Sequence, residues 1–261
     1  GEYGSKEHGA NTCGGLMLSF TAIGKWIGQS TEVDCQNMTQ EEDKKRRETS
    51  MKNLIGYEWK EASDGNKIEV VNPATSELIE TVTEEDVNKA VEVAEIEQKK
   101  WAEVPIHERA DKLYKFVDLI EENKERLAQL LTAETGKPIK EARGEIANVR
   151  IGVRAFIERA KHLYGESIPA GQEAGQEKTM QITKRYPIGV IAAIIPFNFP
   201  SDLFCQKVPP ALLMGNSIIV KPSNYNPLTL IEYVKLMIEA GVPAGCIQIL
   251  TGDGPKVGQA L

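Results

Sequence analysis

Cysteines and long apolar runs are both scarce in this sequence, and each shortage excludes a class of protein. Its 261 residues include four cysteines, none in a C-x-x-C pair, which argues against a disulfide framework and against a zinc site. No window reaches the ~20 apolar residues of a membrane span, because residues 14–28, the best candidate, contain Ser19, Thr21 and Lys25. No basic stretch precedes that segment, as a signal peptide would require. We therefore expect a cytoplasmic protein with no membrane partner and no metal.

Positive charge is the next shortage. The 31 Lys and Arg are outnumbered by 38 Asp and Glu, and the net charge of −7 is spread along the chain rather than collected in a block. Without a basic face, nucleic acid is not an expected partner. The balance of 41% hydrophobic and 26% charged residues is typical of a globular protein, and the length allows more than one packed unit.

Residues 1–50 lack the sustained periodicity of helices and strands and end in a run of charges at 41–48. We expect either a disordered leader or a non-native upstream extension. The second alternative follows from Arg46-Arg47, which AGG-AGG codons can encode. Such codons form a ribosome-binding sequence, and they lie a few codons before Met51. An N-terminus upstream of Met51, measured by mass spectrometry of the native protein, would contradict that alternative.

Residues 51–186 are predicted to form an N-terminal segment that is mainly helical. It opens with two short strands, at 54–59 and 67–71, which we expect to pair as a hairpin across an Asp-Gly turn. A third short strand is expected at 78–82.

Helices follow these strands. Thr83 is the predicted N-cap of a helix that runs to about Trp101, because three acidic residues come directly after it. The clearest later helix has apolar residues at steps of three and four: Ile139, Ala142, Ile146, Val149, Val153, Phe156 and Ala160. Residues 165–175 are a turn-rich break, and residues 178–186 alternate like an exposed strand.

Residues 187–261 change to apolar strands separated by helices, which predicts a truncated Rossmann-like domain. The expected segments are a strand 189–195 buried on both faces, a helix 201–214, a strand 217–221, a helix 228–240 and a strand 247–250. Strand, helix, strand, helix, strand at this spacing indicates βαβ units on a parallel sheet, so the fold class is α/β. The sheet is unfinished, because the chain ends at Leu261 where another helix should begin.

Three loops follow these strands, at 196–200, 221–227 and 251–254. In open parallel sheets, ligands bind beyond the carboxyl ends of the strands. Taken alone, the residues of these loops are weak signals. Asn198 suits an ordinary Asx turn, and most strand-end lysines such as Lys221 are merely solvated. The glycines at 252, 254 and 258 are one residue away from the spacing of the dinucleotide fingerprint, although they follow a strand and open a helix.

Three linked motifs make the loops specific. They are Pro-Phe-Asn-Phe-Pro at 196–200, Pro-Pro-Ala-Leu-Leu-Met-Gly-Asn-Ser-Ile-Ile-Val-Lys-Pro-Ser at 209–223 and Glu-Ala-Gly-Val-Pro-Ala-Gly at 239–245. In order and spacing the chain resembles the NAD(P)-dependent aldehyde dehydrogenase superfamily. The resemblance covers about residues 53–261, including Asn-Pro-Ala-Thr at 72–75 and Glu-Thr-Gly-Lys-Pro at 134–138. It implies that the chain is the N-terminal, cofactor-binding portion of such an enzyme.

The resemblance assigns roles to the loop residues. It implies that the Asn198 amide donates to the aldehyde oxygen when negative charge develops there. It also implies that Lys221 bonds the adenosine ribose. The remaining residues expected near the cofactor are Ile195, Pro196, Phe197 and the Asn198 backbone on the nicotinamide side, with Ser223, Asn224, Gly252 and Val257 elsewhere.

The cofactor is expected to be NAD or NADP. NAD-preferring members of the family often carry a Glu three residues after the lysine, and this carboxylate repels a 2′-phosphate. This sequence has Asn224 there. Because the repulsion is absent, we predict that NADP is accepted.

The chemistry of the family also needs a cysteine thiolate and a water-activating glutamate. The resemblance implies that both lie beyond Leu261. Cys205 and Cys246 are predicted to be small core residues, whereas Cys13 and Cys35 belong to the first 50 residues. The predicted function of the full-length enzyme is oxidation of an aldehyde to the carboxylic acid with NAD(P). The alternative is a non-catalytic fragment with part of the cofactor-binding surface.

The strand expected at 178–186 resembles the oligomerisation hairpin of the family. We therefore expect the full-length enzyme to form a homodimer or homotetramer. The aldehyde itself cannot be read from these residues.

Overall fold

The computed structural model describes residues 53–60, 67–76, 78–83, 87–252 and 254–261. All of them belong to the compact unit Arg47–Leu261. The segment 1–50, with the two alternatives considered for it, lies outside the described residues.

A five-stranded sheet forms the centre of this unit, in the order β2-β1-β9-β8-β7. Its strands are β1 (Asn53–Ile55), β2 (Glu58–Lys60), β7 (Val190–Ile194), β8 (Ser217–Lys221) and β9 (Ile247–Ile249). The last three are parallel, with Ile194 opposite Lys221 and Val220 opposite Ile249, whereas β1 joins β9 antiparallel. The prediction of an α/β fold with βαβ units on a parallel sheet is confirmed.

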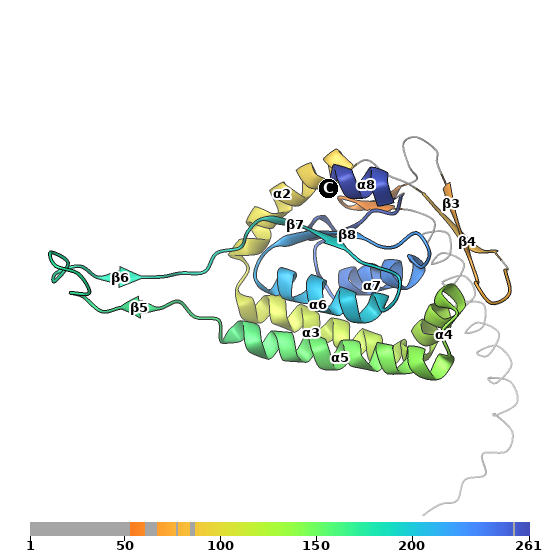
Figure 1. The fold of residues 1–261 in the computed structure, drawn as a ribbon, viewed down its shortest axis with the longest axis horizontal. Helices are drawn as coiled ribbons and strands as arrows, with labels where there is room; N and C mark the ends of the chain where they lie inside the picture. Colours follow the sequence, from red (N-terminus) through yellow and green to blue (C-terminus); the bar gives the residue numbers. More distant parts are fainter. Residues whose placement is uncertain (1–52, 61–66, 77, 84–86, 253) are drawn as a thin grey trace, which may run out of the picture. The chain divides into compact units, whose positions relative to one another are not determined.

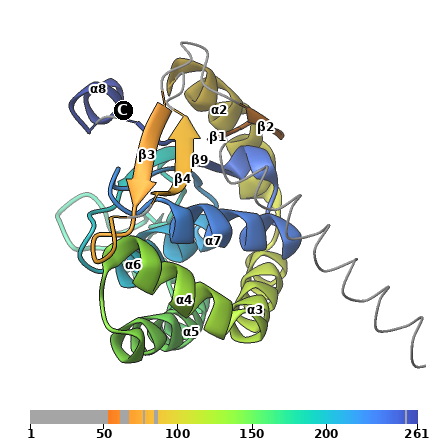
Figure 2. The same ribbon diagram turned by 90° about the vertical axis from the view of Figure 1, so that its right-hand side faces the viewer.

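Helices cover both faces of the sheet in layers (Figures 1 and 2). On one face α2 (Val87–Glu103) packs against β8, and the crossover helices α6 (Pro200–Leu213) and α7 (Leu228–Glu239) lie on the other. Three more helices pack against α6 and α7 from outside: α3 (Ile106–Glu122), α4 (Lys124–Thr135) and α5 (Ile139–Lys161). The short 3-10 turn η1 (Ala244–Cys246) leads into β9, and α8 (Gly254–Ala260) follows it.

The core lies between these layers and is continuous from α5 to the sheet. Three aromatic side chains are fully buried: Phe116 of α3, Phe204 of α6 and Tyr233 of α7. The Tyr233 ring meets each of the two phenylalanine rings edge to face. Burying side chains of this size contributes roughly 2–3 kcal/mol each. The predicted apolar stripe of residues 139–160 is the core face of α5, except that Ile139 and Phe156 are only partly buried.

The predicted hairpin between residues 54–59 and 67–71 is wrong. After β1 the chain turns at Gly56, whose φ of +66° suits a tight turn, so that β1 pairs with β2. β3 (Lys67–Val71) pairs with β4 (Leu78–Thr83) instead. Gly56, the single glycine inside an apolar run, is the sequence signal for this turn. A prediction of one strand over residues 54–59 does not take it into account.

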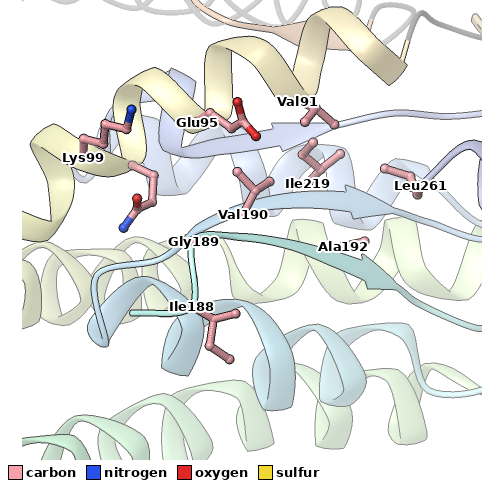
Figure 3. Close-up of a pocket in the computed structure, with 10 residues that line it drawn as sticks. Val91, Glu95, Lys99, Ile188, Gly189, Val190, Ala192, Ile219 and Leu261 are labelled. Carbon is pink, nitrogen blue, oxygen red and sulfur yellow. The ribbon is translucent and has the colours of Figure 1, made fainter. Parts of the chain in front are cut away.

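The prediction that residues 189–195 are buried on both faces is also wrong. β7 is an edge strand of the sheet, with β8 as its one neighbour among the described strands, and Ile194 is 50% exposed. A cavity of about 550 Å³ opens between α2 and this edge, with Glu95 and Lys99 on one wall and Val190 and Ala192 on the other (Figure 3). An apolar run indicates what a strand can bury but not whether both of its faces are covered.

Residues 165–188 form an arm that contains β5 (Ser167–Ile168) and β6 (Gln181–Ile182), which pair antiparallel (Figure 1). We call these residues the β5–β6 arm. The strand predicted at 178–186 is therefore much shorter than expected, and the turn-rich segment contains a strand. Most side chains of the arm are exposed. A longer ladder of paired residues would therefore bury little apolar surface, and such burial is what stabilises a two-stranded hairpin.

The predicted N-cap of α2 is not tested. Thr83 ends β4, and α2 is described from Val87, so the acidic turn between them lies outside the described residues. Within the described part, no helix has the length and apolar character needed to cross a membrane.

Candidate functional site

The ends of the three parallel strands meet at one edge of the sheet. The Ile195 N–H donates to the Lys221 carbonyl (2.9 Å), and the Leu250 N–H donates to the Val220 carbonyl (2.9 Å). The loops that follow the strands surround a cavity of about 590 Å³. Five residues predicted from the sequence line this cavity together: Ile195, Pro196, Lys221, Ser223 and Asn224.

Lys221 carries the positive charge of this cavity and is 4% exposed. Its Nζ donates to the Pro222 carbonyl (2.9 Å) and to Asn224 Oδ1 (3.1 Å). Among the described residues that line the cavity, Lys221 is the only charged one. A buried ammonium held in this way favours a ligand that brings hydroxyl or anionic oxygens.

Part of the cavity wall consists of glycine. Gly254 and Gly258 line it, and a Cβ added at either position would meet no atom within 4 Å. Gly252, which is buried just before them, has a φ of +149° that favours glycine. The wall therefore leaves open space where a ligand can approach the backbone closely.

Pro196 is the residue of the loop 196–200 that lines this cavity, and the rest of the loop continues beside it. The side chain of Asn198 is exposed, and its carbonyl accepts a hydrogen bond from Lys137 Nζ (3.1 Å). The Phe197 carbonyl accepts from Asn226 Nδ2 (2.7 Å). Phe197 lines a second cavity of about 470 Å³ and meets Tyr225, which lines both cavities, edge to face at 5.9 Å.

Two buried glutamates fix the helices that follow the loops. Glu134 of α4 accepts from the N–H groups of Leu228 (2.8 Å) and Thr229 (3.0 Å) at the start of α7. Glu145 of α5 accepts from the Ser201 N–H (2.7 Å) at the start of α6. Neither helix has a side-chain cap of its own, so remote carboxylates replace the local cap.

Burial raises the pKa of Glu134 to about 7, although the hydrogen bonds from Thr229 and Leu228 oppose the shift. Glu145 also pairs with Lys137, whose Nζ lies 4.7 Å from the centre of the Phe199 ring. The sequence alone assigns no role to Glu134, Lys137 or Glu145. For Glu134 and Lys137 a signal does exist, because the segment 134–138 is one of the motifs shared with the family.

Four predicted site residues do not line the cavity of the strand ends. Phe197 lines the second cavity, Asn198 follows it in the same loop, and Gly252 is buried. Val257 packs into a small apolar cluster with Ile55 and Leu250. The cofactor roles of these four residues stay predictions.

The two cysteines of the described part are free and buried. Burial raises the pKa of both the Cys205 and the Cys246 thiols to about 12. Both are confirmed as core residues, and thiols with such a pKa are poor nucleophiles. The described residues contain no group of three His, Cys, Asp or Glu side chains that could hold a metal ion.

The family follows from a comparison with known proteins. Residues 59–261 match the model of the aldehyde dehydrogenase family, which is more than half of the chain. The chain belongs to the aldehyde dehydrogenase family. The resemblance inferred from the three motifs is thereby confirmed.

Curated members of the aldehyde dehydrogenase family are similar to most of this chain. A 3-sulfolactaldehyde dehydrogenase of Priestia aryabhattai is 39% identical over 210 residues, which are 79% of this chain and 43% of the relative. The mitochondrial succinate-semialdehyde dehydrogenase of Oryza sativa subsp. japonica is 39% identical over 211 residues, 80% of this chain and 39% of the relative. The chain thus spans less than half the length of the relatives that it matches.

Solved structures of the family share the fold. An NADP-dependent glyceraldehyde-3-phosphate dehydrogenase from Bacillus halodurans C-125, complexed with NADP, has a TM-score of 0.77 at 36% identity, over 79% of this chain and 44% of that one. A variant betaine aldehyde dehydrogenase from Staphylococcus aureus, in complex with NAD+, has a TM-score of 0.76 at 31% identity, over 81% of this chain and 43% of that one. The aldehyde-dehydrogenase-like fold class is confirmed.

Proposed function

We propose that this chain supplies the NAD(P)-binding part of an enzyme that oxidises an aldehyde to the carboxylic acid. The observation that carries the proposal is the cavity at the three strand ends, where a buried lysine faces an open, glycine-lined wall. Such a cavity fits a dinucleotide, because the ammonium can bond ribose hydroxyls while backbone without side chains admits the rest of the ligand. When bound, NAD(P) supplies the hydride acceptor.

The residues that would hold the cofactor come from two loops. In this proposal Lys221, Ser223 and Asn224 meet the adenosine ribose, whereas Ile195 and Pro196 meet the nicotinamide side; the support for it is that all five line the same cavity. Beside them, the exposed amide of Asn198 can donate to an aldehyde oxygen as it gains negative charge, which lowers the barrier to attack at the carbon.

NADP is accepted in this proposal because Asn224 is neutral. Its Oδ1 accepts from Lys221 Nζ (3.1 Å), so the amide supports the lysine without placing a negative charge beside the ribose. A carboxylate there would repel a 2′-phosphate. Relatives crystallised with NADP and with NAD+ support either cofactor for this fold.

The proposal is tested by titrating NADP into the purified chain and into two variants. Lys221→Met should weaken binding about tenfold or more, because a charged hydrogen bond to the ligand is lost. Lys99→Met is the matched control, since this exposed lysine lines the other cavity, between α2 and β7. Equal affinities of wild type and Lys221→Met, or a loss confined to Lys99→Met, would overturn the proposed site.

The isolated 261-residue chain is proposed to be inactive as a dehydrogenase. Neither Cys205 nor Cys246 is available as a thiolate, since burial raises the pKa of each to about 12. For the polypeptide by itself, the lack of a reactive thiol among the described residues supports the second candidate function, a cofactor-binding fragment without catalysis. Detectable NAD(P)H production from an aldehyde by the purified chain would contradict this part of the proposal.

The β5–β6 arm is proposed to hold two copies of the chain together. Met180, Ile182 and Ile188 are 84%, 69% and 89% exposed, which is unusual for apolar side chains of a lone subunit. A monomer mass of the full-length enzyme in light scattering at all working concentrations would contradict a homodimer or homotetramer. The cytoplasmic location expected from the composition is likewise a proposal, which fractionation of the source cells tests.

A further inference from the structure

A short segment at the C-terminal end of α4 contacts the loop 196–200 and the start of α7, which directly follows the loop 221–227. It consists of residues 134–137, and we call it the 134–137 bracket. Its turn is tight: the Gly136 N–H donates to the Thr132 carbonyl (2.8 Å), φ of Gly136 is +72°, and a Cβ there would lie 2.8 Å from Pro73 Cγ. Thr135 Oγ1 also donates to the Leu131 carbonyl. The backbone between Glu134 and Lys137 is therefore fixed by its own contacts.

One end of the bracket holds the start of α7. Both oxygens of Glu134 are used, because Oε2 accepts from the Leu228 N–H and Oε1 accepts from the N–H and the hydroxyl of Thr229. All three residues are buried. The loop 221–227, which carries Lys221 and Asn224, ends directly at this anchor.

The other end of the bracket holds the loop 196–200. Lys137 Nζ donates to the Asn198 carbonyl (3.1 Å) and to Glu145, and lies over the Phe199 ring. Glu145 in turn accepts from the Ser201 N–H (2.7 Å). One ammonium and its buried carboxylate partner therefore contact Asn198 and Phe199 of the loop and Ser201 at the start of α6.

We infer that the 134–137 bracket positions both loops of the proposed cofactor site, and that Lys137 is a positioning residue for Asn198. The bracket sets the distance between the two loops, because they are tied to residues only three positions apart in a rigid turn. Lys137 fixes the carbonyl of Asn198, which limits rotation of that peptide and so directs the side-chain amide. What the loops bind rests on the proposed function, whereas the contacts that hold them do not.

The first arm of the test measures hydrogen exchange of the purified chain without nucleotide. In Lys137→Met, exchange of the amides at 198–203 should accelerate about tenfold, whereas strand β8 should keep the wild-type rate. Lys140→Met, an exposed lysine of α5, is the matched control and should leave both unchanged. Lys137→Arg should restore protection, because a guanidinium can still donate to Glu145 and to the Asn198 carbonyl.

Two results of this arm would overturn the inference. The first is unchanged exchange at 198–203 in Lys137→Met. The second is an equal acceleration across the whole chain, including β8, because Lys137 would then stabilise the fold without positioning the loop. If Lys137→Met does not fold, Glu145→Gln takes its place under the same criteria, with the exposed Glu141→Gln as its control.

The second arm uses two probes, NADP and its adenosine half, 2′,5′-ADP. Lys137→Met should weaken NADP about fivefold and leave 2′,5′-ADP unchanged, because the loop 196–200 faces the nicotinamide side. Glu134→Gln should weaken both, since the loop 221–227 faces the ribose. Equal effects of both variants on both probes would contradict separate positioning. If the wild-type chain binds neither probe, the proposed function fails, and the exchange arm alone decides whether the bracket holds the loops.

Discussion

The strand-end loops and the β5–β6 arm both lie outside the central sheet and its covering helices, but they are held in different ways. Side chains from distant helices fix the loops, as Glu134 does at α7 and Glu145 at α6. Most polar contacts of the arm join residues of its own hairpin, such as Glu177 with the Gly175 N–H (2.9 Å) and the Glu166 N–H with Thr183, and its apolar side chains are exposed. Polar contacts with distant helices therefore mark the backbone that the fold itself positions, whereas the arm is the segment proposed to gain burial from a second copy of the chain.

The largest expected effect comes from removing the anchor of α7. Glu134→Ala should lower the free energy of unfolding by about 4 kcal/mol, because it leaves three buried donors of Leu228 and Thr229 without an acceptor. Urea denaturation followed by circular dichroism measures this. Glu177→Ala in the arm is the matched variant, because its carboxylate also accepts a backbone N–H but is fully exposed, and it should leave the midpoint unchanged. Equal losses in the two variants would remove the contrast between the regions.

The pH dependence of stability sharpens the same contrast. Burial raises the pKa of Glu134 from its ordinary 4.5 to about 7, so the folded chain binds this proton more tightly than the unfolded chain. The stabilising contribution of that proton is present below about pH 4.5 and is lost as the pH rises through about 7, by up to about 3 kcal/mol. When wild type and Glu134→Gln are denatured across this range, the free energy of unfolding should fall more steeply with rising pH in the wild type. In contrast, the Gly175 N–H lowers the pKa of Glu177, which gives the opposite sign.

A smaller effect is expected at the ribose side of the cavity. Asn224→Glu should shift the ratio of NADP to NAD affinity about tenfold toward NAD, because a carboxylate beside Lys221 repels a 2′-phosphate. Competitive titration of the two nucleotides measures the ratio. Asn148→Asp is the control, because Asn148 is an exposed residue of α5. Asn216→Asp is unsuitable because the Asn216 side chain is buried and hydrogen-bonded. An unchanged ratio would show that position 224 does not face the 2′ position.

The smallest effect on stability is expected in the arm. Ile182→Asp should change the free energy of unfolding by no more than about 0.5 kcal/mol, since the side chain is exposed, yet it should abolish self-association. Light scattering measures the mass, and denaturation at low protein concentration measures the stability of the single subunit. An unaltered mass would show that the arm does not join copies of the chain.

The sheet and its ligand edge could be predicted from the sequence because both depend on local pattern. Short apolar runs that alternate with segments of helical periodicity predict βαβ units. Parallel strands then bring their carboxyl ends to the same edge of the sheet, so Ile195 and Lys221 lie close together although they are far apart in the chain. For the same reason five of the predicted cofactor residues line one cavity.

What could not be predicted depends on contacts between distant segments. Nothing in the pattern of residues 134–145 reveals that two of its carboxylates cap helices that begin at 200 and 228. The exposure of β7 could not be predicted for a related reason, because composition does not show which neighbours cover a strand. The pairing of β1 with β2 depends on a turn at Gly56, where the apolar run alone predicts one continuous strand.

Hydrogen exchange of the purified chain with and without NADP shows where the nucleotide binds. If the strand-end cavity is the cofactor site, NADP should slow exchange in the backbone around it, at 195–198, 221–225 and 254–258, and leave the β5–β6 arm unchanged. Slower exchange along α2 and β7, which line the cavity shown in Figure 3, with no change at the strand ends, would contradict it.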